Sequence, residues 1–185
     1  KYDSDNCYRT LLKRYEANPI LTCEDWPYPV NSVFNPGAAM VNGRYLLLVR
    51  VEDRRGFSHL CAARSPNGFS DWEIDPQPTL APWSEKYPEE SWGIEDPRVT
   101  WLEDLGFWAV AYTAYSKAGP LVCLATTRDF VRFERLGPVM PPEDKDAALF
   151  PVRFKGRYAM LHRPVPGSSF GRHIWISFSP DLKHR

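Results

Sequence analysis

A strand–turn–strand pattern occurs three times along this chain, and it restricts the possible folds more than any other feature. Each copy has a residue before proline, a short apolar strand, a glycine turn and a second strand that starts near an aromatic residue, which are the signs of a β-hairpin. A repeated β-meander is typical of propeller blades. The hairpins span 35–50, 96–112 and 150–162, with turn glycines at Gly43, Gly106 and Gly156.

Each hairpin is followed by a third apolar strand and a polar ending, at 59–65, 121–127 and 173–179. The sequence therefore predicts an all-β domain over 19–185, built from three blade units of a β-propeller. Closed propellers have about four to eight blades, so we expect this chain to be part of a longer polypeptide. The alternative is an open array of three sheets, which would leave bare edges.

The N-terminal segment, residues 1–18, has a different pattern. Four apolar residues recur at helical spacing and predict an amphipathic helix over 3–17, which Asn18-Pro19 ends. We expect this helix to pack on its own domain or on a partner subunit. The apolar positions are Tyr8, Leu11, Leu12 and Tyr15.

Composition excludes some classes of partner. The 23 basic and 23 acidic residues cancel, so no global field attracts nucleic acid or an anionic membrane. An aromatic content of 14% together with 18 prolines and 11 glycines favours short strands joined by turns.

The four cysteines predict no metal site, because none forms a C-x-x-C pair and no histidine lies at ligand spacing from one. We interpret them as reduced, mostly buried thiols of a cytoplasmic protein; their even number leaves disulfides open. No apolar run approaches the roughly 20 residues of a membrane span, and no signal peptide begins at the first residue, although a processed export signal remains an alternative. The cysteines are Cys7, Cys23, Cys61 and Cys123.

Residues 91–98, Ser-Trp-Gly-Ile-Glu-Asp-Pro-Arg, are the strongest candidate for a functional site. Two adjacent carboxylates, a proline and an arginine lie between a glycine turn and a strand-forming run. The proline favours extended geometry at Asp96 and predicts that the next strand starts at this point. A carboxylate held rigidly there can act as a proton donor or a ligand; the alternative is a polar turn with a local Asp–Arg pair.

The repeat strengthens the functional interpretation. Asn35 and Asp96 occupy the same place, just before proline, in successive units. The first strand of each propeller blade lines the central axis, so we expect Asp96 to face a central pocket. The second strands end in polar residues, at 50–55, 112–115 and 162–164, which we expect near the same pocket.

Six runs of the sequence resemble glycoside hydrolase family 130, the β-mannoside phosphorylases. They occur in the family's order and cover about residues 18–185. The runs are 34–38 (Phe-Asn-Pro-Gly-Ala), 50–56 (Arg-Val-Glu-Asp-Arg-Arg-Gly), 92–98 (Trp-Gly-Ile-Glu-Asp-Pro-Arg), 112–116 (Tyr-Thr-Ala-Tyr-Ser), 142–151 (Pro-Glu-Asp-Lys-Asp-Ala-Ala-Leu-Phe-Pro) and 162–164 (His-Arg-Pro).

The resemblance implies a five-bladed β-propeller with the site at its axis. It also implies inverting phosphorolysis of a β-mannoside, expected to be β-1,4-linked to mannose, glucose or N-acetylglucosamine, to give α-mannose 1-phosphate. Inorganic phosphate is the co-substrate, and no cofactor or metal is expected. The expected partners are the oligosaccharide and phosphate, with no nucleic acid or membrane, and the expected assembly is a homo-oligomer.

Residue roles follow from the same resemblance. Asp96 matches the general acid, whose proton passes through the 3-hydroxyl of the sugar. The mannosyl unit would be held by Asn35, Arg50, Glu52 and Asp53, and the phosphate by Lys145 and His162, with Arg54, Arg163 and Arg128 placed beside them. Tyr115 would contact the sugar, and Trp26, Trp83 and Trp92 are candidates for stacking on sugar rings, with burial in the core as their alternative.

Other interpretations stay open at this point. Lys145 and Arg163 can form surface ion pairs with Asp144 or Asp146, and His162 can be a satisfied histidine at a strand end. A hydrolase of the same fold needs a base, for which Glu52 and Glu95 are the candidates. A glycan-binding propeller without catalysis is the alternative from another class. Sucrose-type and arabinan-type hydrolases also place Asp-Pro at blade entries, but they need further carboxylates.

Overall fold

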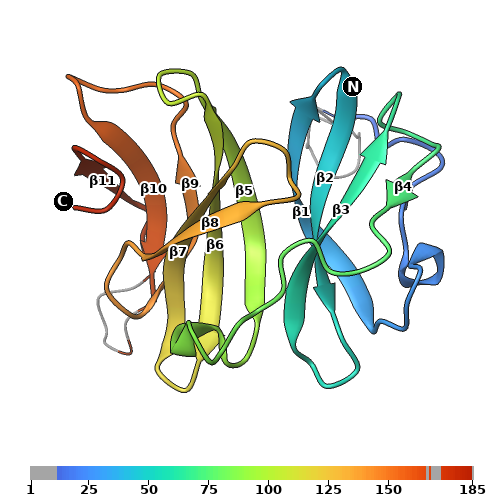
Figure 1. The fold of residues 1–185 in the computed structure, drawn as a ribbon, viewed down its shortest axis with the longest axis horizontal. Coiled ribbons are helices and arrows are strands. Elements are labelled where there is room, and N and C mark those ends of the chain that lie inside the picture. The colour runs from blue at the N-terminus through green and yellow to red at the C-terminus, as the bar shows by residue number, and fades with distance from the viewer. Residues whose placement is uncertain (1–11, 166, 168–171, 185) are drawn as a thin grey trace, which may run out of the picture.

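The computed structural model describes residues 12–165, 167 and 172–184 of the chain. In this part, strands form three antiparallel sheets, and within each sheet the strands follow chain order (Figure 1). The first sheet contains β1 (Ser32–Val41), β2 (Arg44–Glu52), β3 (Ser58–Ser65) and β4 (Glu73–Ile74). The second contains β5 (Ile94–Leu102), β6 (Phe107–Ser116), β7 (Gly119–Thr127) and β8 (Phe133–Pro138). The third contains β9 (Asp144–Leu149), β10 (Tyr158–Pro164) and β11 (Trp175–Ser179). Two short 3₁₀ helices, η1 (Cys23–Asp25) and η2 (Pro88–Glu90), lie in the connections.

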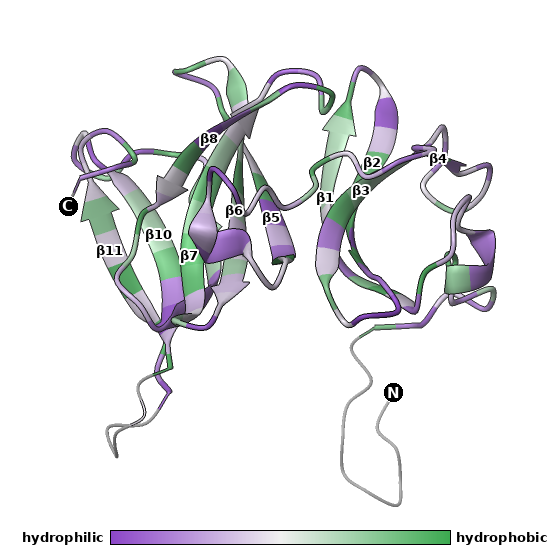
Figure 2. Ribbon diagram, turned by 60° about the horizontal axis from the view of Figure 1, so that its bottom comes forward, coloured by the Kyte–Doolittle hydropathy of each residue, from purple (hydrophilic) through white to green (hydrophobic). Residues whose placement is uncertain are grey.

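The prediction of an all-β chain with three meander units is confirmed. The sheets stand side by side, and the first strand of each contacts the first strand of the next, β1 with β5 and β5 with β9 (Figure 1). In the described part the three sheets do not close into a barrel. Hydrophobic colouring follows the strands, whereas the connections are largely hydrophilic (Figure 2).

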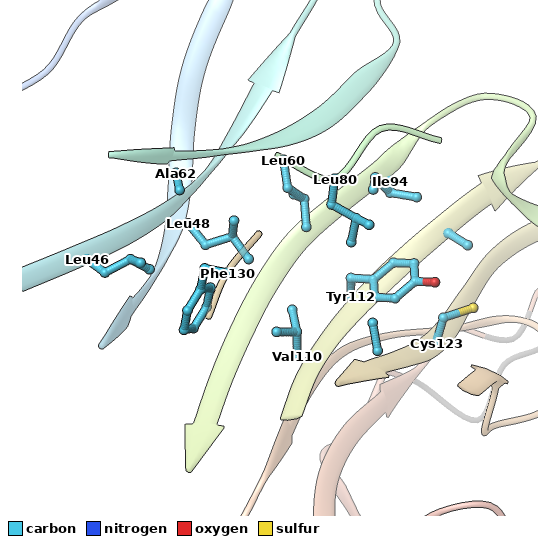
Figure 3. Close-up of a cluster of buried hydrophobic side chains, with 12 residues drawn as sticks. Leu46, Leu48, Leu60, Ala62, Leu80, Ile94, Val110, Tyr112, Cys123 and Phe130 are labelled. Atoms are coloured by element: carbon cyan, nitrogen blue, oxygen red, sulfur yellow. The ribbon is translucent and has the colours of Figure 1, made fainter. Parts of the chain in front are cut away.

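The middle sheet is buried on both faces, and the alternation of side chains along its strands explains why. Val110 and Tyr112 of β6 belong to the core shared with the first sheet (Figure 3), whereas Ala109 and Ala111 belong to the core shared with the third. Each large side chain buried in this way contributes about 1.5–3 kcal/mol. A near-continuous apolar run in β6 is therefore what this position in the fold requires.

The first strands share one irregularity, which positions the candidate site. Each contains a β-bulge, shown by a register shift, and at each bulge one residue has positive φ. These residues are Asn35 (φ 45°), Asp96 (φ 51°) and Asp146 (φ 56°). Asn and Asp tolerate this conformation better than other residues with a side chain. The bulge therefore places a polar side chain at an equivalent point in each sheet.

The bulges correct the prediction for proline. Pro36 and Pro97 lie inside β1 and β5 rather than at the start of a strand. A bulge interrupts the hydrogen-bonded ladder, so it accepts a residue that has no N–H to donate.

The third hairpin also differs from its prediction. Its first strand is β9, which ends at Leu149, before Phe150-Pro151. Residues 152–157 form a connection with one isolated bridge, between Phe154 and Arg157. The Phe150-Pro151 pair therefore does not correspond to Asn35-Pro36 and Asp96-Pro97, which lie inside the first strands of their sheets. Asp146, not Phe150, takes the place of Asn35 and Asp96.

The predicted N-terminal helix is wrong where it can be compared. Residues 1–11 lie outside the described residues, and residues 12–17 form no helix, with a turn at 16–17. Leu12 is 86% exposed, and Tyr15 contacts only the edge of the domain through the Phe69 ring, 5.2 Å away.

Cys23, Cys61 and Cys123 carry free thiols, and the latter two are buried; Cys7 lies outside the described residues. Trp26 is buried against the outer face of the first sheet, which matches its core alternative. Among the described residues, no helix is both long enough and apolar enough to cross a membrane.

A buried ion pair fixes the connection that leads into β5. The Glu90 carboxylate of η2 accepts hydrogen bonds from the Tyr112 hydroxyl and from Arg135 Nε, both at 2.9 Å. The same carboxylate accepts from the backbone N–H of Trp83 at 2.9 Å. Both charged side chains are nearly inaccessible to water, at 0% for Glu90 and 10% for Arg135. This network ties β6 and β8 to the chain a few residues before Asp96.

Replacing Glu90 by glutamine tests this network. Glu90→Gln leaves the buried Arg135 without its counter-charge, so we expect a loss of about 3–5 kcal/mol in the free energy of unfolding, measured by urea denaturation. Glu85→Gln, at an exposed position of the same connection, is the matched control and should change stability by less than about 0.5 kcal/mol. Equal effects of the two substitutions would contradict a structural role for the ion pair.

Candidate active site

Asp96 lies where the first and second sheets meet, in the bulge of β5, and is only 9% exposed. Its carboxylate accepts two hydrogen bonds on one oxygen, Oδ1. Asn35 Nδ2 in the bulge of β1 and Arg50 Nη1 of β2 donate them, each at 3.0 Å. Among the described residues, no hydrogen bond ends on Oδ2, so this oxygen is the one available to a ligand. The structure therefore brings together Asn35, Arg50 and Asp96, as the sequence predicted.

Arg50 is the centre of the hydrogen-bond network. Its guanidinium forms a two-pronged contact with Glu95, from Nη1 to Oε2 and from Nη2 to Oε1, both at 3.1 Å. Its Nε donates to Ser58 Oγ at 2.9 Å, and its Cζ lies 4.4 Å from the centre of the Phe34 ring. Glu52 is more distant, with Nη2 to Oε2 at 3.8 Å, and it also accepts from Asn31 Nδ2 at 3.0 Å.

The two adjacent carboxyl groups have pKa values displaced in opposite directions. Burial alone would raise the pKa of Asp96, but the hydrogen bonds from Asn35 and Arg50 and the charges of Arg50 and Lys145 lower it below its ordinary value. Burial raises the pKa of Glu95; Arg50 and Lys145 offset this only in part, since Asp96 and Glu52 add negative charge beside it.

Lys145 belongs to the same charge cluster, although it comes from the third sheet. Its positive charge lowers the pKa of both Glu95 and Asp96. Among the described residues, no carboxylate lies within ion-pair distance of its amino group. The alternative of a surface ion pair between Lys145 and Asp144 or Asp146 is therefore not formed in this part of the chain. The ammonium group is available to an anion.

Arg163 and His162 are occupied within the third sheet. Arg163 donates from Nε and Nη2 to Asp146 Oδ2, so it forms the ion pair that was the alternative to phosphate binding. His162 is buried; its Nδ1 lies 2.5 Å from Asp144 Oδ2 and its Nε2 lies 2.9 Å from Ser177 Oγ. This arrangement matches the alternative of a satisfied histidine. A role of either residue in phosphate binding would require these contacts to rearrange, and it stays a prediction.

Two further predicted residues, Asp53 and Arg54, lie in the turn between β2 and β3. Asp53 is engaged in the β2–β3 turn, where it accepts from Arg55 and from the backbone N–H of Phe57. Its pKa is lowered, because these hydrogen bonds and the Arg55 charge exceed the opposing effect of burial. Arg54 is exposed in the same turn.

Arg128 does not belong to the site. It follows the end of β7, next to the Thr127–Trp108 pair, whereas Asp96 lies near the Ile94–Ala114 pair at the opposite end of the sheet. The strand register therefore contradicts the placement of Arg128 beside the phosphate. Tyr115, in contrast, lies at the correct end, where its ring is 5.9 Å from that of Trp92.

Aromatic side chains form the edge of this region. Trp92 is 44% exposed, and its backbone N–H donates a hydrogen bond to the Tyr115 carbonyl oxygen of β6 at 2.8 Å. An exposed, fixed aromatic face suits stacking on a pyranose ring. Trp83 is also exposed but packs against Tyr87.

Sequence reasoning missed two partners of Arg50, Ser58 and Phe34, because a contact across strands leaves no local signal. It also missed the place of Asp146, for which a signal exists: Asp146 precedes Gly156 by the same spacing as Asp96 precedes Gly106. In the described ranges no group of three or more His, Cys, Asp or Glu is arranged to hold a metal ion.

Chemically, the site combines one oxygen of a buried carboxylate, an ammonium group without an ion-pair partner among the described residues, and aromatic surface. Arg50 and Lys145 face three carboxylates, those of Glu52, Glu95 and Asp96. The arrangement can hold a polar ligand against Asp96 and exchange a proton with it, while Lys145 can attract an anion.

Comparisons with known proteins agree with the resemblance. The chain is similar to the β-1,2-mannobiose phosphorylase of Listeria innocua, with 32% identity over 93% of this chain and 63% of that protein. It is similar to the 1,2-β-oligomannan phosphorylase of Thermoanaerobacter sp., with 33% identity over 94% and 58%, and to the β-1,4-mannooligosaccharide phosphorylase of Ruminococcus albus, with 33% over 95% and 53%. The chain thus spans less than two thirds of the length of these relatives.

A solved structure shows the same fold. The Listeria innocua β-1,2-mannobiose phosphorylase in complex with β-1,2-mannobiose superposes with a TM-score of 0.82 and 30% identity, over 92% of this chain and 63% of that one. The family model described as beta-1,4-mannooligosaccharide phosphorylase matches residues 11–184. With this match over nearly the whole chain, and with relatives at 32–33% identity over more than nine tenths of it, the chain belongs to glycoside hydrolase family 130.

Proposed function

We propose that the protein that contains this chain is an inverting mannoside phosphorylase. Two features support this proposal most directly: Asp96 Oδ2 accepts no hydrogen bond from a described residue, and the Lys145 charge acts on Asp96 although no described carboxylate lies within ion-pair distance of Lys145. Phosphate would form a bond to C1 of the mannosyl unit while the glycosidic C1–O bond breaks. The proton of Asp96 would pass through the sugar 3-hydroxyl to the departing oxygen, giving α-mannose 1-phosphate and a shortened acceptor.

The lowered pKa of Asp96 means that its role as a proton donor requires ligand binding to raise this pKa. In the free site, Arg50 and Lys145 hold Asp96 as the anion. A phosphate dianion bound beside Lys145 would compete for its charge and place a like charge near the carboxylate, and both effects raise a carboxyl pKa. Phosphate binding would thereby prepare Asp96 as a proton donor.

Glu52 and Glu95, the candidates for a hydrolytic base, are both engaged by donors, Glu95 by Arg50 and Glu52 by Asn31. A phosphorylase needs no such base, because phosphate is already a nucleophile. We propose phosphorolysis rather than hydrolysis because the cation Lys145 acts on Asp96 and can attract phosphate, and not because these two carboxylates are engaged.

The substrate class we propose is a β-mannoside. The sequence motifs predict a β-1,4 linkage, whereas the relatives above are named for β-1,2 and β-1,4 linkages at nearly equal identity. We also propose that the three sheets are blades of a five-bladed propeller completed by residues outside this chain, in a cytoplasmic homo-oligomer that needs no cofactor.

Release of mannose 1-phosphate by the full-length protein tests the function. We expect phosphate-dependent release from β-1,4-mannobiose, β-1,2-mannobiose or mannosyl-β-1,4-N-acetylglucosamine, with the preferred substrate deciding the linkage. Asp96→Asn should lower kcat by about 10²- to 10⁴-fold while substrate binding is largely kept. Asp71→Asn, an exposed aspartate with similar backbone geometry (φ 54°), is the matched control and should be fully active.

Two results would contradict the proposal. Release of free mannose whether or not phosphate is present would indicate a hydrolase and direct attention to Glu52 and Glu95. Glycan binding without any cleavage, unchanged by Asp96→Asn, would indicate a binding propeller.

The opposite pKa displacements of Asp96 and Glu95 predict opposite pH dependences of stability. The folded-state pKa of Asp96 is lowered, so its ionisation stabilises the fold above the ordinary pKa of about 3.9, and this contribution is lost as the pH falls. The stability difference between the wild type and Asp96→Asn should therefore decrease on acidification. The folded-state pKa of Glu95 is raised, so the difference between the wild type and Glu95→Gln should decrease as the pH rises above about 4.3. Urea denaturation at a series of pH values measures both; slopes of the same sign would contradict the electrostatic description of the site.

A further inference from the structure

We propose that Ser58 is a positioning residue that fixes the Arg50 guanidinium and thereby the orientation of the Asp96 carboxylate. The proposal rests on the function proposed above for Asp96. In this proposal the main role of Arg50 is to hold the carboxylates of Glu95 and Asp96. Ser58 touches neither of these two carboxylates, yet its removal should change turnover.

The donors of Arg50 are almost fully committed. Nε donates to Ser58 Oγ, and Nη1 donates to both Glu95 Oε2 and Asp96 Oδ1. Nη2 contacts Glu95 Oε1 at 3.1 Å and lies 3.8 Å from Glu52 Oε2. An arginine has five N–H groups in a rigid planar fork. Little donor capacity therefore remains for a sugar, and the direction of every contact depends on the plane of the guanidinium.

Ser58 holds the guanidinium at Nε, whereas the carboxylates of Glu95 and Asp96 contact Nη1 and Nη2. Because the fork is rigid, fixing Nε sets the rotation at which Nη1 meets Asp96. The Phe34 ring, 4.4 Å from Cζ, limits tilting of the guanidinium. Ser58 is 1% exposed, so its hydroxyl is shielded from a sugar or phosphate and reaches the charged cluster through Arg50 Nε.

The position of Ser58 is itself fixed by close backbone packing. It pairs with Glu52 across β2 and β3, and it forms an isolated parallel bridge with Gly93, three residues before Asp96. A Cβ atom on Gly93 would lie 2.6 Å from the backbone nitrogen of Ser58 and 2.7 Å from its carbonyl oxygen, and Gly93 has φ 110°. Only glycine fits this contact. The segment that leads to Asp96 and the strand that carries Ser58 are thus held in register, with Arg50 between their side chains.

Ser58→Ala tests the proposal because it removes the hydroxyl and leaves the backbone contact with Gly93 intact. We expect kcat for phosphorolysis by the full-length protein to fall on the order of 10- to 100-fold, since small misplacements of catalytic groups have effects of this size, with a smaller change in KM for phosphate. Weaker contact with Arg50 should raise the pKa of Asp96, so the alkaline limb of the pH–kcat profile should move to higher pH. Ser58→Thr keeps the hydroxyl and should restore both. Ser84→Ala, an exposed serine of the β4–β5 connection, should behave as the wild type.

A second measurement does not require activity. In a double-mutant cycle, the unfolding free energies of Ser58→Ala, Asp96→Asn and the double variant should be non-additive at neutral pH, because both changes act on Arg50. Additive effects would overturn the proposal, as would a loss of kcat in Ser58→Ala with an unmoved alkaline limb. A wild type that releases no mannose 1-phosphate, combined with a non-additive cycle, would refute the proposed function and leave the positioning by Ser58 intact.

Discussion

The close contact between neighbouring sheets at their first strands is the constraint on which the rest of this structure depends. A Cβ atom on Gly37 would lie 2.8 Å from Val99 Cγ2 and 2.9 Å from the Pro97 carbonyl oxygen, so β1 and β5 meet where only glycine fits. The bulges of both strands lie at this contact, and Asn35 reaches Asp96 across it. The cores on either side of the middle sheet stabilise the contact, because the alternating side chains of β6 and β7 fill both gaps between sheets.

A second consequence is electrostatic. Carboxylates from two sheets converge on one buried arginine, and such an arrangement is stable only when donors are available for each of them. Asn35, Arg50 and Asn31 provide these donors, and Lys145 of the third sheet adds positive charge. The site therefore exists only when three sheets are assembled, although each contributes only one or two of its charged groups. The equivalent bulge in the third sheet differs, because Asp146 pairs with Arg163 from its own sheet, whereas Asp96 accepts its hydrogen bonds from residues of the neighbouring first sheet.

Sequence patterns predicted the coarse structure well where the signal is local. The X-Pro pairs, glycine turns and spacing of the repeats located the first two hairpins and the third strands, because these depend on neighbouring residues. The patterns failed in two places: residues 12–17, the described part of the predicted helix, are not helical, and the Phe150-Pro151 pair imitates a blade entry without being one. For the site, Asp96, Asn35, Arg50 and Lys145 were predicted from motif matches, whereas the placement of Arg128 was wrong because a motif gives no strand register.

The sequence by itself determined the all-β class, the three meander units, the family and the carboxylate at the centre of the site. Each of these is encoded in residues close together in the chain or in motifs whose order is preserved. Only the tertiary structure decided which groups are free and which are paired. Arg163 and His162 are occupied, Lys145 is not within ion-pair distance of a described carboxylate, and Arg50 is held by Ser58 and Glu95. The physical reason is that hydrogen-bond partners are set by distances across strands and sheets, which residue types and spacing leave undetermined.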